Sequence, residues 1–146
     1  MKVLIAYYSR YGHTFQMARA VKEGVMSVSG VEAVLRRIQE FPDIEKDIDK
    51  DKYAKQVWEQ QKDIPVCMLD DLREADGVIF GTPTRYGNMT AQMKRFVDST
   101  AELWMAGALE DTARFVGLNS PIVRATVDKY TEDIAVDSRR IQAHDS

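Results

Sequence analysis

Residues 2–14 read KVLIAYYSRYGHT, a continuous apolar run that passes directly into a polar loop containing Gly12. A short apolar run without alternation is typical of a strand buried on both faces of a parallel sheet. Beyond the loop, small or apolar residues recur at the spacing of one helical face, at Thr14, Ala18, Val21 and Val25. Residues 2–14 therefore predict a buried strand, a tight turn and the start of an amphipathic helix.

The same order of strand, loop and helix is repeated along the chain. Residues 31–37 predict a second strand and residues 77–81 a third, which runs into a polar loop and then a helix from Thr90. The charged stretch between them, residues 41–76, predicts short helices at 53–61 and 69–75. Strands that alternate with helices indicate an α/β protein with a doubly wound parallel sheet and right-handed crossovers.

The last part of the chain predicts one more strand, at residues 114–118, and then a helix that begins at Ser120-Pro121. Its apolar residues form one helical stripe, at Val123, Val127, Tyr130, Ile134 and Ile141. We therefore divide the chain into an α/β domain with a shortened sheet of about four strands, residues 1–118, and an amphipathic helical tail, residues 119–146.

Composition excludes several classes of protein. The 146 residues fit one domain, and the net charge of −3 comes without a basic patch, so we expect no nucleic-acid partner. The single cysteine, Cys67, excludes an internal disulfide, and no metal site is expected. We interpret it as a buried structural thiol. No stretch predicts a signal peptide or a membrane span, so we expect a soluble, cytoplasmic protein.

Two loops are candidates for ligand binding, because ligands of open α/β sheets bind beyond the carboxyl ends of the strands. The first loop follows the first strand and comprises Ser9, Arg10, Tyr11, Gly12, His13 and Thr14. Its amides and hydroxyls precede a helix, whose N-terminus favours an anion such as a phosphate. The alternative interpretation of this loop is a polar turn that caps the helix.

The second loop, residues 82–89, follows the third strand and contains Pro83, Thr84, Arg85, Tyr86 and Gly87. Pro83 restricts the backbone and Gly87 relieves crowding, so amides and the Tyr86 ring can lie against a planar heterocycle. Arg85 is either a donor to such a ring or a solvated surface cation.

Three segments together resemble the WrbA-type NAD(P)H:quinone oxidoreductases, a flavodoxin-like family. These segments are residues 3–14, residues 81–96 and residues 103–109, and the resemblance extends over about residues 1–116. It implies a flavodoxin-like fold, FMN as cofactor, and a homo-oligomer, either dimer or tetramer.

The resemblance also implies roles for particular residues. The first loop, Ser9 to Thr14, would hold the FMN phosphate and ribityl chain, and Thr84, Arg85 and Tyr86 would border the flavin ring. Tyr11 matches a position near the nicotinamide, and Trp104 matches one that lines the quinone site, often from a neighbouring subunit. NAD(P)H would give a hydride to the flavin and a quinone would then be reduced, so no catalytic side chain is assigned.

The resemblance ends within a few residues after Leu109, and the family continues with a third, Ser/Thr- and Gly-rich flavin loop that this sequence lacks. Two other functions therefore stay open. One is a flavodoxin-type electron carrier, although Trp104 has no role in it. The other is a non-enzymatic oligomerisation or regulatory module that has lost FMN.

Overall fold

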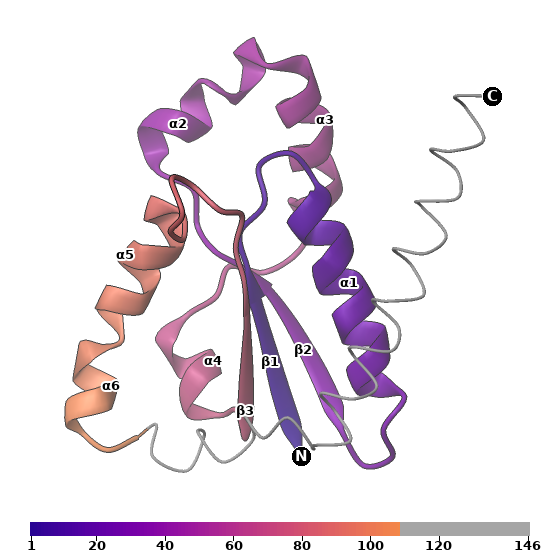
Figure 1. Ribbon diagram of the computed structural model, residues 1–146, viewed down its shortest axis with the longest axis vertical. Coiled ribbons are helices and arrows are strands. Elements are labelled where there is room, and N and C mark those ends of the chain that lie inside the picture. The colour runs from indigo at the N-terminus through magenta and orange to yellow at the C-terminus, as the bar shows by residue number, and fades with distance from the viewer. Residues whose placement is uncertain (109–146) are drawn as a thin grey trace.

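The computed structural model describes residues 1–108 (Figure 1). Its strands are β1 (Lys2–Tyr7), β2 (Glu32–Arg37) and β3 (Gly77–Gly81). Its helices are α1 (His13–Met26), α2 (Pro42–Lys46), α3 (Lys52–Gln61), α4 (Leu69–Arg73), α5 (Ala91–Ser99) and α6 (Ala101–Met105), with a 3-10 turn η1 (Ile48–Lys50). The predicted strand at residues 114–118, the helical tail and the predicted boundary at 118/119 lie outside the described residues.

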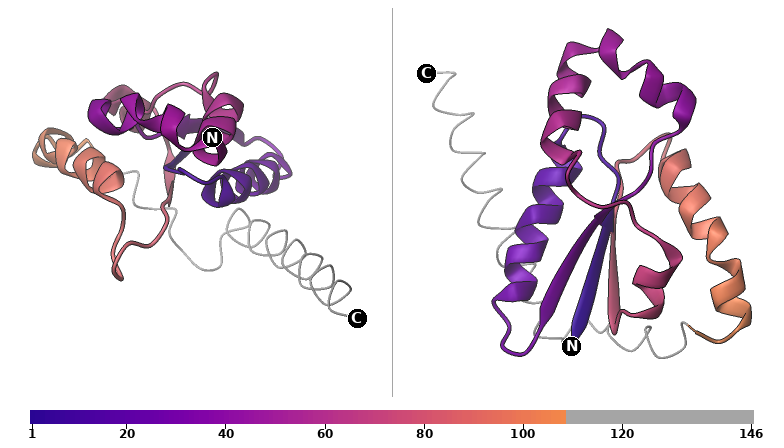
Figure 2. Two further views of the ribbon diagram at one scale, coloured as in Figure 1. Left: turned by 90° about the horizontal axis from the view of Figure 1, so that it is seen from above. Right: turned by 180° about the vertical axis from the view of Figure 1, so that it is seen from behind.

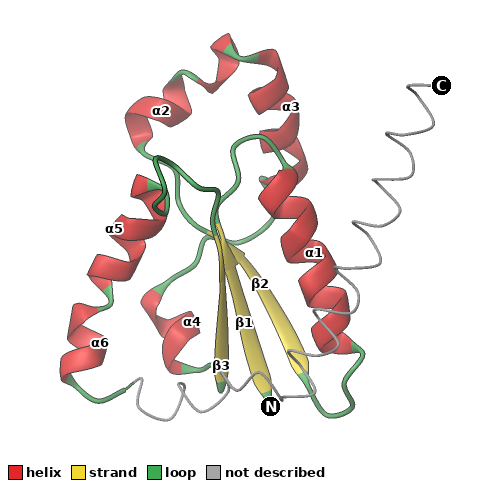
Figure 3. Ribbon diagram, in the orientation of Figure 1, coloured by secondary structure: helices red, strands yellow, loops and turns green. Residues whose placement is uncertain are grey.

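The three strands form a parallel sheet in the order β2-β1-β3 (Figure 3). Lys2 of β1 pairs with Glu32 of β2, and Val3 pairs with Gly77 of β3. The chain therefore leaves β1 toward one neighbour and returns to pair on its other side. Such a reversal of strand order leaves a crevice between two loops at the carboxyl ends of the strands.

Strand β1 is buried on both faces, as its unbroken apolar run predicts. Leu4, Ala6 and Tyr8 point into one apolar cluster, while Val3, Ile5 and Tyr7 point into another. Successive side chains of a strand alternate between faces, so a strand at the centre of a covered sheet needs apolar residues at every position.

A layer of helices covers each face of the sheet (Figure 2). Helix α1 packs on the face of Val3 and Ile5 through Phe15, Ala18 and Val25. This outcome confirms the predicted helical face, on which Thr14, Ala18 and Val25 are buried. Helices α4, α5 and α6 cover the other face through Leu72, Met93 and Leu103.

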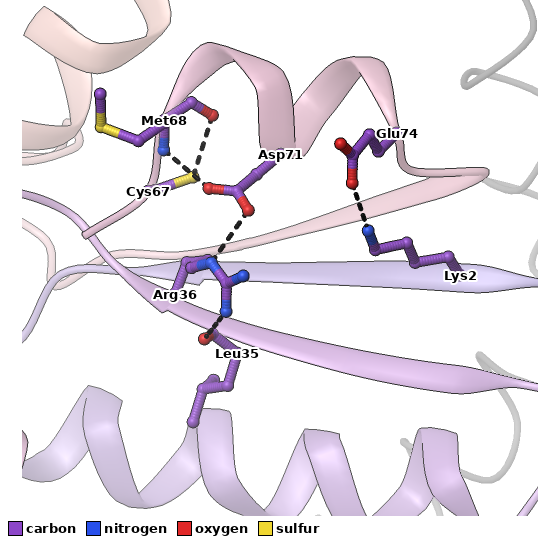
Figure 4. A network of polar contacts seen from close by, with 7 residues as sticks. All are labelled: Lys2, Leu35, Arg36, Cys67, Met68, Asp71 and Glu74. Atoms are coloured by element: carbon purple, nitrogen blue, oxygen red, sulfur yellow. Dashed lines mark hydrogen bonds and ion pairs between the residues drawn. The ribbon is translucent and has the colours of Figure 1, made fainter. Parts of the chain in front are cut away.

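Ion pairs tie the short helix α4 to the sheet (Figure 4). Asp71 accepts a hydrogen bond from Arg36 Nε of β2 at 2.9 Å, and its other oxygen accepts from the Met68 N–H at 2.8 Å. Lys2 Nζ of β1 lies 2.7 Å from Oε2 of Glu74, the C-cap residue of α4. Asp71 therefore both caps α4 and anchors it on β2.

Helices α2 and α3 form an insertion that lies beyond the carboxyl ends of the strands (Figure 1). Asp51 caps α3 by accepting hydrogen bonds from Tyr53 N and Ala54 N. Trp58 of α3 is half-buried, and the Arg37 guanidinium lies 4.6 Å from the centre of its ring. This contact fixes the insertion on the end of β2. Within residues 1–108, no helix is long and apolar enough to cross a membrane.

Cys67 is buried, with 4% of its surface exposed, as predicted for a structural thiol. Burial, with a smaller effect from Asp71, raises the pKa of its thiol to about 12. Because the thiolate is the reactive form, we expect the native protein not to react with an aromatic disulfide reagent at about pH 8. The unfolded protein should react fully, and the reaction is followed by absorbance. Rapid labelling of the native protein would contradict this burial.

Candidate functional site

The first and second loops leave the sheet side by side. Tyr8 N, one residue past β1, donates a hydrogen bond of 2.9 Å to the Gly81 carbonyl at the end of β3. A Cβ atom at Gly81 would lie 3.1 Å from Tyr7 Cβ and 3.3 Å from Thr14 Cγ2. The glycine therefore lets β3 approach both β1 and the start of α1, which brings the two loops together.

The first loop ends in a helix N-terminus that is open to an anion. Gly12 occupies the N-cap with a positive φ of 89°, and its N–H donates to Ser9 Oγ at 3.1 Å. Since Gly12 has no side chain, none caps α1 within the described residues, and the first turn contains no acidic residue. The leading N–H groups of α1 and the helix dipole thus favour a phosphate.

The individual residues of the first loop differ in exposure. Gly12 and Thr14 are buried, Ser9 and Arg10 are half-buried, and Tyr11 and His13 are exposed; His13 and Thr14 already belong to the first turn of α1. The Arg10 guanidinium lies 3.9 Å from a Glu40 carboxylate oxygen and 5.8 Å from the Tyr11 ring centre. Arg10 therefore lies between Tyr11 of the loop and the buried Glu40 of the core.

The insertion supports the outer side of the first loop. Tyr11 stacks on Tyr53 with ring centres 6.2 Å apart, and Gln61 Nε2 donates to the Ser9 carbonyl at 3.2 Å. The Ala54 N–H, and with smaller effect Tyr11, lowers the pKa of Asp51. The sequence predicted the helix of the insertion but gave no signal that Tyr53 and Gln61 contact this loop.

The second loop is closed at its base by threonines and at its tip by a tight turn. Thr82 Oγ1 accepts from Thr90 N at 3.2 Å. Arg85 and Asn88 exchange two backbone hydrogen bonds, of 2.7 and 2.9 Å. Between them, Tyr86 and Gly87 have positive φ values of 50° and 76°, as in a type I′ turn.

The tip of the second loop projects into solvent. Pro83 is half-buried, whereas Thr84, Arg85, Tyr86 and Gly87 are exposed, and Tyr86 is fully exposed. A tyrosine at positive φ is strained, and no burial offsets that strain here. Strain of this kind at an exposed aromatic residue points to a ligand-contacting role.

A buried carboxylate that the sequence did not single out lies beside the two loops. Glu40 accepts hydrogen bonds of 2.6 Å from Tyr8 Oη and 2.6 Å from Gln92 Nε2. Burial, followed by the hydrogen bond to Glu40, raises the pKa of Tyr8. The sequence did contain one signal for Glu40, because it is a carboxylate that follows a parallel strand by a few residues. Ligands of open α/β sheets bind at this end of the strands.

Trp104 is not brought together with the loops. Its helix, α6, lies toward the opposite end of the sheet (Figure 1), and 76% of the side chain is exposed. Trp104 is therefore a surface residue on a helix away from both loops.

The strand order β2-β1-β3, with both loops at the β1/β3 reversal, defines a flavodoxin-like doubly wound α/β protein. Residues 1–117 match the family "NADPH-dependent FMN reductase", and the chain belongs to this family.

Proteins named NAD(P)H dehydrogenase (quinone) are close in sequence. The one from Syntrophobacter fumaroxidans is 52% identical over 120 residues, which cover 82% of this chain and 58% of that protein. The one from Geobacter metallireducens is 51% identical over 109 residues, 75% of this chain and 53% of the relative. These names confirm the resemblance found in the sequence. The chain spans little more than half the length of these relatives.

Among solved structures, a flavodoxin-type WrbA-like protein from Agrobacterium tumefaciens is 28% identical, with a TM-score of 0.49. The alignment covers 74% of this chain and 52% of that one. A flavodoxin from the domain Archaea is 26% identical, with a TM-score of 0.46, covering 68% and 51% of the two chains.

The strain at Tyr86 yields a test of the turn. Asparagine tolerates positive φ, so Tyr86→Asn should raise the free energy of unfolding by up to about 1 kcal/mol, whereas Gly87→Val should lower it by about 1–2 kcal/mol. Urea denaturation of the two variants measures both values. Equal stabilities for wild type and Gly87→Val would show that the turn does not have this geometry.

Proposed function

We propose that this protein is an FMN-dependent NAD(P)H:quinone oxidoreductase that holds FMN between the first and second loops. The main support for the proposal is the position of two features at the β1/β3 edge. The N-terminus of α1, which has no side-chain cap within the described residues, lies beside the exposed second loop with its strained Tyr86. Family membership and the names of the relatives support the same activity.

The donor set of the first loop fits a phosphate monoester. Ser9 and the first turn of α1 offer a hydroxyl and N–H groups, and Gly12, as the cap, has no side chain that would compete for them. We assign the phosphate and the ribityl chain to Ser9, Arg10, Tyr11, Gly12, His13 and Thr14.

The second loop fits the flavin ring. Thr84, Arg85, Tyr86 and Gly87 are exposed, and Pro83 and the turn geometry restrict their backbone. We assign the ring border to Pro83, Thr84, Arg85, Tyr86 and Gly87. In this proposal Arg85 donates to the ring and offsets negative charge on it.

Bound FMN supplies two-electron chemistry: NAD(P)H, a quinone and a proton give NAD(P)⁺ and the hydroquinone. The residues of this chain bind and orient the reactants. Tyr11, exposed beside the first loop, borders the nicotinamide. Trp104 lines the quinone site of a neighbouring copy, which accounts for its exposure far from the loops of its own chain. We therefore propose a homo-oligomer, a dimer or tetramer, acting in the cytoplasm.

The binding of FMN is tested with two glycine variants. Gly12 and Gly30 both have positive φ, at 89° and 78°, so alanine strains both positions similarly, but only Gly12 lies in the first loop. Wild type and Gly30→Ala should quench FMN fluorescence and oxidise NAD(P)H in the presence of benzoquinone. Gly12→Ala should weaken FMN binding by at least about tenfold. Absence of FMN binding by wild type would overturn the proposed function.

The role of Trp104 is tested separately. Trp104→Ala should leave the dissociation constant of FMN unchanged and raise the KM for benzoquinone by about tenfold, because an apolar wall of that site is lost. An unchanged KM would exclude Trp104 from the quinone site. Analytical ultracentrifugation of both proteins shows whether any change reflects loss of assembly.

A further inference from the structure

Glu40 is a buried charge with a full set of partners. Only 5% of the residue is exposed. Its Oε1 accepts from Gln92 Nε2 at 2.6 Å and from Phe41 N at 2.9 Å, and its Oε2 accepts from Tyr8 Oη at 2.6 Å. The Arg10 guanidinium lies 3.9 Å from the same Oε2.

Tyr8, Phe41 and Gln92 each donate a hydrogen bond to Glu40, and Arg10 adds an ion pair. A carboxylate is acceptor-only and can serve several donors at both oxygens, whereas an amide would turn its NH₂ toward one of them. A buried charge is costly unless it is paired and hydrogen-bonded in this way. The position therefore suits a carboxyl group better than an amide.

The partners of Glu40 belong to the supports of both ligand loops. Arg10 is part of the first loop. Gln92 lies in the first turn of α5, and Thr90, the cap of that helix, binds Thr82 of the second loop. Glu40 thus connects two loops that are about seventy residues apart in the sequence.

We propose that Glu40 is a positioning residue for FMN, which holds Arg10 beside the first loop at a fixed place relative to α5 and the second loop. The proposal rests on the proposed function. An arginine that is already fixed loses less side-chain entropy when an anion binds, so the affinity for the phosphate group rises. The flavin ring, bound by the second loop, gains little from this effect.

The phosphate-dependent part of the affinity is measured by comparing FMN with riboflavin, which lacks the phosphate. The dissociation constants of both ligands are determined by fluorescence for wild type and Glu40→Gln. We expect the ratio of riboflavin to FMN dissociation constants to fall about tenfold in Glu40→Gln, through weaker FMN binding. Riboflavin binding should change little.

Asp71→Asn is the matched control. Asp71 is also a partly buried carboxylate that pairs with an arginine, Arg36, but it caps α4 away from both loops (Figure 4). It should lower stability without changing the ratio. If Glu40→Gln weakens both ligands equally, or binds FMN more tightly because a negative charge is gone, Glu40 does not position Arg10.

A second variant keeps the test decisive if Glu40→Gln does not fold. Gln92→Met keeps both charges and a side chain of similar shape but removes the hydrogen bond from α5 to Glu40. It should lower the ratio in the same direction, by about two- to fivefold. An unchanged ratio in Gln92→Met would then overturn the proposal. Failure of wild type to bind FMN would instead overturn the proposed function and, with it, this inference.

Discussion

Strand β1 pairs with a parallel strand along each edge and packs against a helical layer on each face, and this double burial determines the rest of the arrangement. Parallel strands end at the same side of the sheet, so the segments after β1 and β3 must begin next to each other. The hydrogen bond from Tyr8 N to the Gly81 carbonyl continues the pairing one step beyond β1. The candidate site is therefore a consequence of strand order, and the loop residues adapt to a position that the sheet has already fixed.

At this edge the protein gives up local stability in several places. Helix α1 lacks a side-chain cap in the described part of the chain, Tyr86 has a strained backbone, and Glu40 keeps a charge away from water. Helices α3 and α5 have ordinary caps, Asp51 and Thr90, whereas α2 and α6, like α1, have no side-chain cap hydrogen bond in the described part of the chain. The strain at Tyr86 and the buried Glu40 lie at the edge where ligands of open α/β sheets bind.

The sequence predicts the elements well because their signals are local. The third strand at residues 77–81 agrees with β3 to the residue, and the predicted face of α1 is buried as expected. Both loops could be located because each follows an apolar run.

The partners of Glu40 could not be predicted from the sequence. Gln92 lies 52 residues away, and no local sequence pattern links the two residues. The same holds for Gln61 and Ser9, also 52 residues apart. Periodicity reports which side of an element is buried, but the identity of the buried neighbour depends on the tertiary fold.

The insertion of α2, η1 and α3 is best understood as part of the site. Tyr53 stacks on Tyr11, Gln61 holds the Ser9 carbonyl, and Val57 Cγ2 lies 3.4 Å from where a Cβ atom of Gly12 would stand. These contacts all come from the side of the first loop that faces α3. A short loop with a glycine at its tip has many conformations in isolation, and fixing it on one side removes most of them before a ligand arrives. Glu40 pairs with Arg10 of the same loop, so the first loop is supported both by the insertion and by a buried side chain of the core.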